Sequence, residues 1–180
     1  MRTYYYLLFA FAIISLNACQ KEQDKAGLAN DIAILEDSVF TENREGFRPL
    51  QEANARLLVE KYEAFAKSKV EASQAIDALF KAVSVAQYNR SYAKAAQLLE
   101  QIYSKYPDTD AAVRARFDEA YLYDDKIKNI EKARTLYEAL IKDYPNSDYR
   151  VLAEQSLSVL GKNLEDILKE AKEKAANAVE

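Results

Sequence analysis

Apolar residues recur at helical spacing along most of this chain. From Gln51 onward they lie three, four or seven positions apart, which predicts amphipathic α-helices. Strand-like alternation of apolar and polar residues is absent. The chain has only three glycines and three prolines, which favours long helices joined by short turns. The pattern therefore predicts an all-α fold.

Six helices are expected between residues 51 and 160, the first ending near Ser68 and each having one apolar face. Their apolar positions are, in chain order, Leu57, Leu58, Tyr62, Phe65 and Ala66; Ala75, Ile76, Leu79, Phe80, Val83 and Ala86; Tyr92, Ala95, Leu98, Leu99, Ile102, Tyr103 and Tyr106; Val113, Phe117, Ala120, Tyr121 and Tyr123; Ala133, Leu136, Tyr137, Leu140, Ile141 and Tyr144; and Val151, Leu152, Ala153, Leu157 and Leu160.

The segments on either side of these six helices are simpler. An earlier helix is expected over Leu28–Phe40, followed by a loop over Thr41–Leu50. Gly161 occupies the usual glycine position after a helix, and Asn163 is expected to cap a last helix that leads into a charged tail. Their apolar positions are Leu28, Ile32, Ile34, Leu35 and Val39 before the six helices, and Leu164, Ile167, Leu168 and Ala171 after them.

One segment of the chain repeats after 38 residues, when Tyr92–Ala115 is laid over Ile130–Ala153. The nine identical positions in 24 pair Lys94 with Lys132, Ala95 with Ala133, Leu98 with Leu136, Glu100 with Glu138, Tyr106 with Tyr144, Pro107 with Pro145, Asp110 with Asp148, Val113 with Val151 and Ala115 with Ala153. Composition alone would give about one or two matches. Internal periods of this length indicate stacked helix pairs, which usually bind partners rather than catalyse reactions.

A similar turn sequence occurs in both copies of this repeat, as Tyr106-Pro107-Asp108-Thr109-Asp110 and Tyr144-Pro145-Asn146-Ser147-Asp148. Proline disfavours helix in the residue before it, so each preceding helix should end there. The Asp, Thr, Asn and Ser side chains that follow can cap the next helix. The small Ala95 and Ala133 are expected where two helices approach closely.

These residues resemble the tetratricopeptide repeat family. The helix-ending Pro107 lies 12 residues after the small Ala95, as in the family's second helix, and Val83 and Ala120 occupy the small position of its first helix. Phe80 and Phe117 each lie three residues earlier, and the linking segment Asp124–Asn129 is interpreted as a lengthened turn between helices. The resemblance covers Leu57–Lys169. It implies a short right-handed α-solenoid of helix hairpins, with a degenerate earlier repeat in which Val70 replaces the proline.

The resemblance also implies where a partner would bind. First helices of such repeats line a concave groove, which here would include Asp77, Ser84, Arg114, Tyr121 and Asp124. An aromatic groove for a peptide or glycan is an alternative use of the ten tyrosines after residue 19. We favour tyrosines that fill helix–helix contacts with their hydroxyls at the surface.

The N-terminus predicts a lipoprotein. Arg2 precedes a nearly unbroken apolar run over Tyr4–Leu16, which is too short to span a bilayer but suits a secretory signal. The sequence Leu16-Asn17-Ala18-Cys19 resembles a bacterial lipobox, so Cys19 is expected to be lipidated. The alternative is an ordinary signal peptide with a chance cysteine at its end. The expected divisions are residues 1–18 (signal), 19–27 (tether), 28–50 (helix and loop), 51–160 (repeats) and 161–180 (capping helix and tail).

Composition argues against an enzyme. The chain has no histidine and one cysteine, which removes the usual nucleophile pairs and zinc ligand sets, and its scattered glycines form no phosphate loop. Carboxylate pairs such as Asp124-Asp125 or Glu22 with Asp24 are better explained as solvated surface. We expect no catalytic residues, no metal and no cofactor. The net charge of −4 also disfavours nucleic acid as a partner.

The sequence therefore predicts a lipid-anchored binding or scaffold protein that captures a protein or peptide of the bacterial cell envelope in a helical groove. A permanent structural subunit of an outer-membrane assembly complex and a carboxylate-dependent wall- or glycan-acting enzyme are the alternatives. The "KYP" and "DYP" helix ends resemble those of small envelope lipoproteins of the Bacteroidetes type. Those proteins share their repeat style with the accessory lipoprotein of outer-membrane protein assembly and the Tol-Pal-associated repeat protein. Gln20 resembles an outer-membrane sorting signal. We expect the outer membrane, with the periplasmic face favoured over the cell surface.

Overall fold

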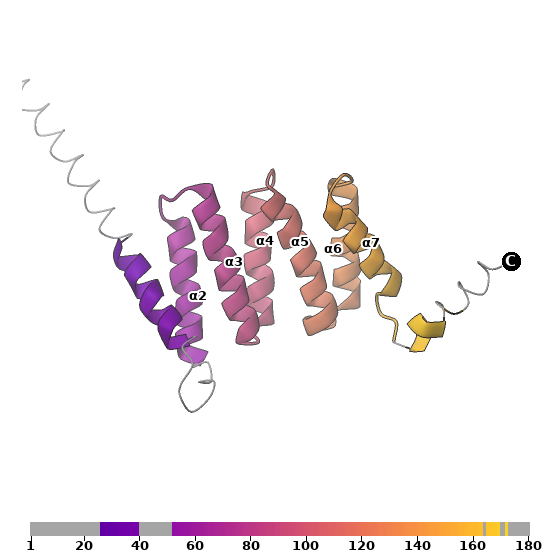
Figure 1. Ribbon diagram of the computed structural model, residues 1–180, viewed down its shortest axis with the longest axis horizontal. Coiled ribbons are helices and arrows are strands. Elements are labelled where there is room, and N and C mark those ends of the chain that lie inside the picture. Colours follow the sequence, from indigo (N-terminus) through magenta and orange to yellow (C-terminus); the bar gives the residue numbers. More distant parts are fainter. Residues whose placement is uncertain (1–25, 40–51, 164, 170–171, 173–180) are drawn as a thin grey trace, which may run out of the picture. The chain divides into compact units, whose positions relative to one another are not determined.

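The computed structural model describes residues 26–39, 52–163, 165–169 and 172 of the chain. Within these residues every regular element is a helix, and no strand occurs. Within each unit, consecutive labelled α-helices run in opposite directions (Figure 1). The all-α α-solenoid class that the sequence predicts is confirmed.

The helices match the predicted stripes closely. Those with labels in Figure 1 are α2 (Glu52–Lys67), α3 (Ala72–Tyr88), α4 (Tyr92–Lys105), α5 (Asp110–Leu122), the π-helical turn η1 (Tyr123–Ile127), α6 (Ile130–Asp143) and α7 (Asp148–Val159). Unlabelled helices cover residues 26–39 and 165–169. The chain divides into two compact units, with the boundary between Arg90 and Ser91.

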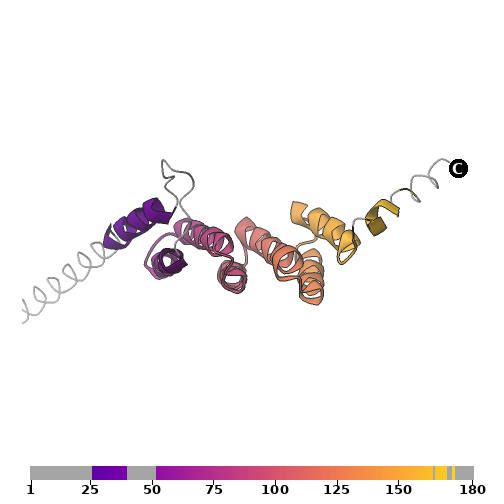
Figure 2. The ribbon, with the colours of Figure 1, turned by 90° about the horizontal axis from the view of Figure 1, so that it is seen from below.

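The first unit contains the helix at residues 26–39, α2 and α3. Figure 2 shows this N-terminal helix, in indigo, beside the two magenta helices. Ile32 and Val39 are its buried residues, and Leu58, Tyr62 and Leu79 are among the buried residues of α2 and α3. The degenerate earlier repeat that the resemblance implies contains α2, and the structure places residues 26–39 against that helix.

The second unit contains α4 to α7, and its core lies between α5, α6 and α7. The buried members of this cluster are Val113, Ala120, Ala133, Leu136, Tyr137, Leu140, Ala153 and Leu160. Phe117 packs between two rings, with its centroid 5.7 Å from that of Tyr137 and 5.5 Å from that of Tyr149. Offset aromatic contacts at these distances add to the stability that burial provides. Three consecutive helices therefore share one apolar core.

Both proline turns have the predicted construction. α4 ends at Lys105 before Tyr106-Pro107, and α6 ends at Asp143 before the equivalent pair. The Thr109 hydroxyl accepts a hydrogen bond from the backbone N–H of Ala112 at 3.3 Å, and Ser147 caps α7 in the same way. The hydroxyl of Tyr144 also reaches the carbonyl oxygen of Pro107 at 3.4 Å. One turn is thereby tied to the next.

The linking segment Asp124–Asn129 differs from the lengthened turn that the sequence predicts. Tyr123–Ile127 continues α5 as a π-helical turn, so most of the extra residues stay helical. Lys128 then adopts a left-handed backbone with φ 59°, and the Asn129 side chain accepts from the N–H of Lys132 at 3.0 Å. Single π turns absorb an inserted residue while keeping the helix intact. The longer period is therefore accommodated mainly within the first helix.

Six residues assigned to apolar faces are exposed instead, among them Tyr121 (52%) and Leu168 (51%). Ile34 and Leu57 are 60% and 41% exposed. The buried faces of their helices contain Ile32 and Leu58 instead. Val151 and Leu152 of α7 are 45% and 43% exposed. Periodicity identifies apolar residues, but burial also requires a neighbouring helix to cover them. These six predictions were wrong for that reason.

The ends of the chain are described only in part. Gly161 has φ 76° after α7, and the Asn163 side chain accepts from the N–H of Asp166 at 2.9 Å, as predicted. The predicted signal peptide, Cys19, most of the tether, the loop at 41–50 and most of the charged tail lie outside the described residues. In the part of the chain that is described, no helix has the length and apolarity needed to cross a bilayer.

Candidate protein-binding surfaces

Two of the predicted partner-binding residues, Asp77 and Ser84, lie on α3 in the first unit. They are seven residues apart, which places them two turns apart on one side of the helix, and both are exposed. The opposite side carries buried residues such as Leu79 and Ala82. The Ser84 hydroxyl donates to the carbonyl oxygen of Phe80 at 3.1 Å. The structure thus places a polar, accessible face on the first helix of this repeat.

The other predicted residues lie in the second unit, on α5 and η1. Arg114 and Tyr121 are again seven residues apart, and their exposed fractions are 55% for the Arg114 side chain and 52% for Tyr121. The Arg114 guanidinium lies 3.4 Å from the Asp118 carboxylate one turn along, and burial raises the pKa of Asp118. Asp124 is half-buried at the start of η1. α5 therefore repeats the exposed face of α3 with a different chemistry, basic and aromatic.

The tyrosines occupy several environments. Tyr62 and Tyr137 are buried, while Tyr88 and Tyr121 are 45% and 52% exposed. Burial raises the pKa of the Tyr137 hydroxyl, and the nearby Ser156 side chain opposes this. The half-buried tyrosines are Tyr92, Tyr103, Tyr106, Tyr123, Tyr144 and Tyr149.

A polar cluster joins α4, α5 and α6 behind the exposed face of α5. Arg116 pairs with Asp143, and its guanidinium carbon lies 4.8 Å from the centre of the Tyr103 ring and 5.5 Å from that of Tyr144. Cation–π contacts of this kind stabilise more when the cation is shielded from water, and the Arg116 side chain is only 18% exposed. The cluster fixes the three helices relative to one another. Their exposed residues are therefore presented on a rigid support.

Glu119 is the buried carboxyl of this cluster, with 3% of its surface exposed. It accepts a hydrogen bond from Tyr103, while its Oε2 atom has no partner within the described residues. Burial raises the pKa of Glu119, and the nearby charge of Glu100 adds to this, whereas Tyr103, Lys132 and Arg116 oppose it. Burial and the Glu119 carboxylate in turn raise the pKa of Tyr103.

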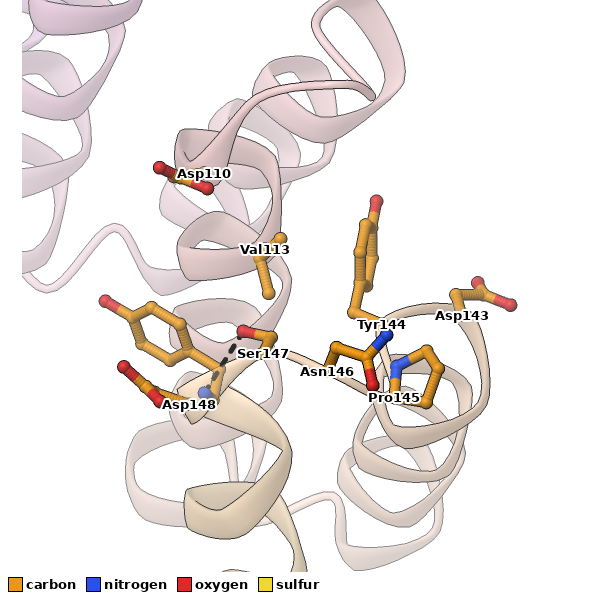
Figure 3. A pocket seen from close by; sticks show the side chains of 9 residues that line it. Asp110, Val113, Asp143, Tyr144, Pro145, Asn146, Ser147 and Asp148 are labelled. Atoms are coloured by element: carbon orange, nitrogen blue, oxygen red, sulfur yellow. Dashed lines mark hydrogen bonds between the residues drawn. The ribbon is translucent and has the colours of Figure 1, made fainter.

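An open pocket of about 670 Å³ lies where the start of α5 faces the turn between α6 and α7 (Figure 3). Its lining is Asp110, Val113, Asp143, Tyr144, Pro145, Asn146, Ser147, Asp148 and Tyr149. The Ser147 hydroxyl that borders it accepts from the N–H of Tyr149 at 3.2 Å. The second proline turn thus forms a wall of the pocket as well as ending α6.

Sequence reasoning missed this pocket and the buried polar cluster. One signal was available for the cluster, because Glu119 aligns with Leu157 at the 38-residue period. An acidic residue at a position that is apolar in the other repeat indicates either a solvated helix face or a buried charge. Nothing in the sequence distinguishes these two cases, since the tyrosine and lysine that surround Glu119 come from other helices.

These surfaces carry side chains that are suited to contacts with a binding partner. Among the described residues, no group of three acidic, histidine or cysteine side chains is arranged to hold a metal ion. The exposed side chains of α3 and α5 offer hydrogen bonds, charge and the aromatic rings of Tyr88 and Tyr121. Repeated hairpins with accessible first-helix faces are typical of helical-repeat binding modules.

Comparison with known families agrees with this class. The tetratricopeptide repeat family model matches two successive stretches of the chain, residues 77–109 and 114–147. The first match begins within α3 and ends just after α4, and the second begins within α5 and ends just after α6. No significant match was found among curated proteins or among solved structures. Repeats of this family generally serve as scaffolds for protein–protein interaction rather than as enzymes.

Proposed function

We propose that this chain is a lipid-anchored binding module of the bacterial cell envelope that captures a protein or peptide through the first helices of its repeats. The partner would contact Asp77 and Ser84 in the first unit, and Arg114, Tyr121 and Asp124 in the second. The observation that carries the proposal is the pair of exposed residues, seven positions apart, that recurs on α3 and α5 while the opposite faces are buried. Preformed helical surfaces bind with little loss of conformational entropy.

The proposal is tested by partner capture from solubilised envelope with the chain as bait. The double variant Arg114→Ala/Tyr121→Ala should lose most of the captured partner, because both side chains are about half exposed. Its melting temperature should change by less than about 2 °C, since exposed substitutions cost little stability. The matched control is Glu138→Ala/Lys142→Ala on the exposed side of α6.

The two variants together decide the outcome. If both variants captured equal amounts of partner, the proposal that the partner binds the first helices would be wrong. A large loss of stability in the Arg114 and Tyr121 variant would show instead that these residues support the core.

The anchoring part of the proposal rests on the lipobox-like Leu16-Asn17-Ala18-Cys19. Two or more acyl chains on Cys19 would hold the mature chain stably at the outer membrane, where we place it on the periplasmic face. Mass spectrometry of the mature N-terminus tests the lipid, and protease treatment of intact cells tests the side. An unmodified N-terminus would refute the anchor without affecting the binding surface.

A second candidate is a permanent structural subunit of an outer-membrane assembly complex. It is supported by the exposed apolar residues Val151, Leu152 and Val159 on α7, because flat apolar faces favour obligate contacts. Mild cross-linking followed by purification separates the two candidates. A stoichiometric complex that survives washing favours the structural subunit, and partner exchange on washing favours the capture module.

A further inference from the structure

The N-terminal helix, residues 26–39, lies on the surface of α2 and α3 and is held there by polar contacts. The Lys61 ammonium donates to the Asp31 carboxylate at 2.6 Å, and Lys81 donates to Glu36 at 3.1 Å. The Tyr62 hydroxyl donates to the same Glu36 carboxylate. All three partners of Asp31 and Glu36 come from α2 and α3, and two of them are lysines, so the acidic edge of one helix meets basic side chains.

The apolar part of this contact is small and incompletely filled. Ile32 and Val39 are the buried residues of the helix, while Leu28 and Leu35 are half-buried and Ile34 is exposed. A cavity of about 310 Å³ remains between the three helices of this unit. It is lined by Ala29, Ile32, Tyr62, Phe65, Gln74, Asp77, Ala78 and Lys81.

The two ion pairs are accessible to water, whereas Tyr62, the third partner, is buried. The side chains of Asp31 and Lys81 are 48% and 60% exposed, and that of Glu36 is 33% exposed. Ion pairs at such exposure contribute little and weaken further with salt. A helix of this length is marginal by itself, so it would lose its structure if it left the surface. The contact therefore has the features of a reversible one.

We propose that residues 26–39 act as a strap that competes with a partner for the surface of α2 and α3, and that this partner is an acidic amphipathic helix. Such a helix would place two carboxylates on Lys61 and Lys81 and apolar residues over Tyr62 and Phe65. Asp77, one of the residues assigned to partner capture, lines the same cavity as Ala29 and Ile32 of the strap. The inference rests on the proposed binding function and names the chemistry of the ligand.

The first experiment measures hydrogen exchange of the whole chain with the strap contacts reversed in charge. In Asp31→Lys/Glu36→Lys, amides of residues 26–39 should exchange at least about tenfold faster, while α4 to α7 keep their protection. The control Glu60→Lys/Glu131→Lys has the same change in net charge at exposed positions and should leave the strap protected. In the unaltered chain, raising NaCl from 0.05 to 0.5 M should accelerate exchange in residues 26–39 selectively.

The second experiment adds a synthetic peptide of residues 26–39 in trans and follows binding by fluorescence anisotropy. It should bind the Asp31→Lys/Glu36→Lys variant at least tenfold more tightly than the unaltered chain, whose tethered strap has a high effective concentration. A peptide that itself carries Asp31→Lys and Glu36→Lys should not bind. Two results would overturn the proposal. In the first, residues 26–39 stay protected in the variant and at high salt. In the second, the variant does not bind the acidic peptide. Neither measurement needs an envelope partner, so failure here is separate from failure of the proposed function.

Discussion

Ala133 shows what a single side chain does in this fold. It is fully buried in the cluster shared by α5, α6 and α7, at the position where the sequence predicts close helix approach. Ala133→Leu should reduce the free energy of unfolding by about 1–3 kcal/mol, because a larger side chain forces the helices apart. Urea unfolding measures this. Ala93→Leu on the exposed side of α4 is the control, and an equal loss in both variants would contradict the packing argument.

Glu119 gives a prediction about pH at the same scale. Burial raises its pKa in the folded chain above the unfolded value. Its contribution to stability is therefore complete below the unfolded pKa, near 4.3, and is lost as the pH rises through the folded pKa. Glu119→Gln removes the charge but keeps an acceptor for Tyr103, so it should be more stable than the unaltered chain at pH 7, by roughly 1 kcal/mol.

Urea unfolding between pH 4 and pH 8 measures this difference. The advantage of Glu119→Gln should shrink toward pH 4, where both carboxyl and amide are neutral. A difference between the two chains that does not change with pH would show that the charge of Glu119 has no part in it.

At the scale of the element, caps and helix stops were the features that the sequence predicted best. Pro107, Thr109 and Gly161 act through their own backbone or the next few residues, so the local sequence contains the whole cause. The π turn after α5 could not be predicted in this way. The π-helical conformation depends on how η1 packs against α4 and α6. The sequence of the six-residue segment does not specify that packing.

The cap after that π turn can be tested directly. Asn129 begins α6 by accepting from the N–H of Lys132 at 3.0 Å. Asn129→Ala should cost about 1 kcal/mol in unfolding free energy, since it leaves a helix N–H without its partner. Asn146→Ala, an exposed asparagine in the turn between α6 and α7, should cost less than about 0.5 kcal/mol. Equal costs in thermal or urea unfolding would mean that α6 does not depend on this cap.

At the scale of the molecule, the sequence predicted which residues are apolar better than which are covered. Leu98, Leu99 and Leu140 belong to the predicted apolar faces and are buried, because the helices of these residues have a neighbouring helix before and after them in the chain. Val151 and Leu152 follow the same stripe and are exposed. The candidate partner residues Asp77 and Arg114 could be placed on helices from the sequence. The contacts of Glu36 with Tyr62 and Lys81 could not, since they join residues 26 and 45 positions apart.

This uneven burial predicts how stability is distributed along the chain. α4 contains five buried residues, Ala95, Ala96, Leu98, Leu99 and Ile102, whereas Ala153 is the one buried residue of α7. Repeat proteins open locally where each helix has few buried contacts, so amides of α7 should exchange faster than those of α4 under native conditions. Raising urea below the main transition should increase this difference. Equal protection in the two helices would mean that residues beyond Leu160 cover Val151 and Leu152 in solution. The structural-subunit candidate would then lack the exposed apolar face that supports it.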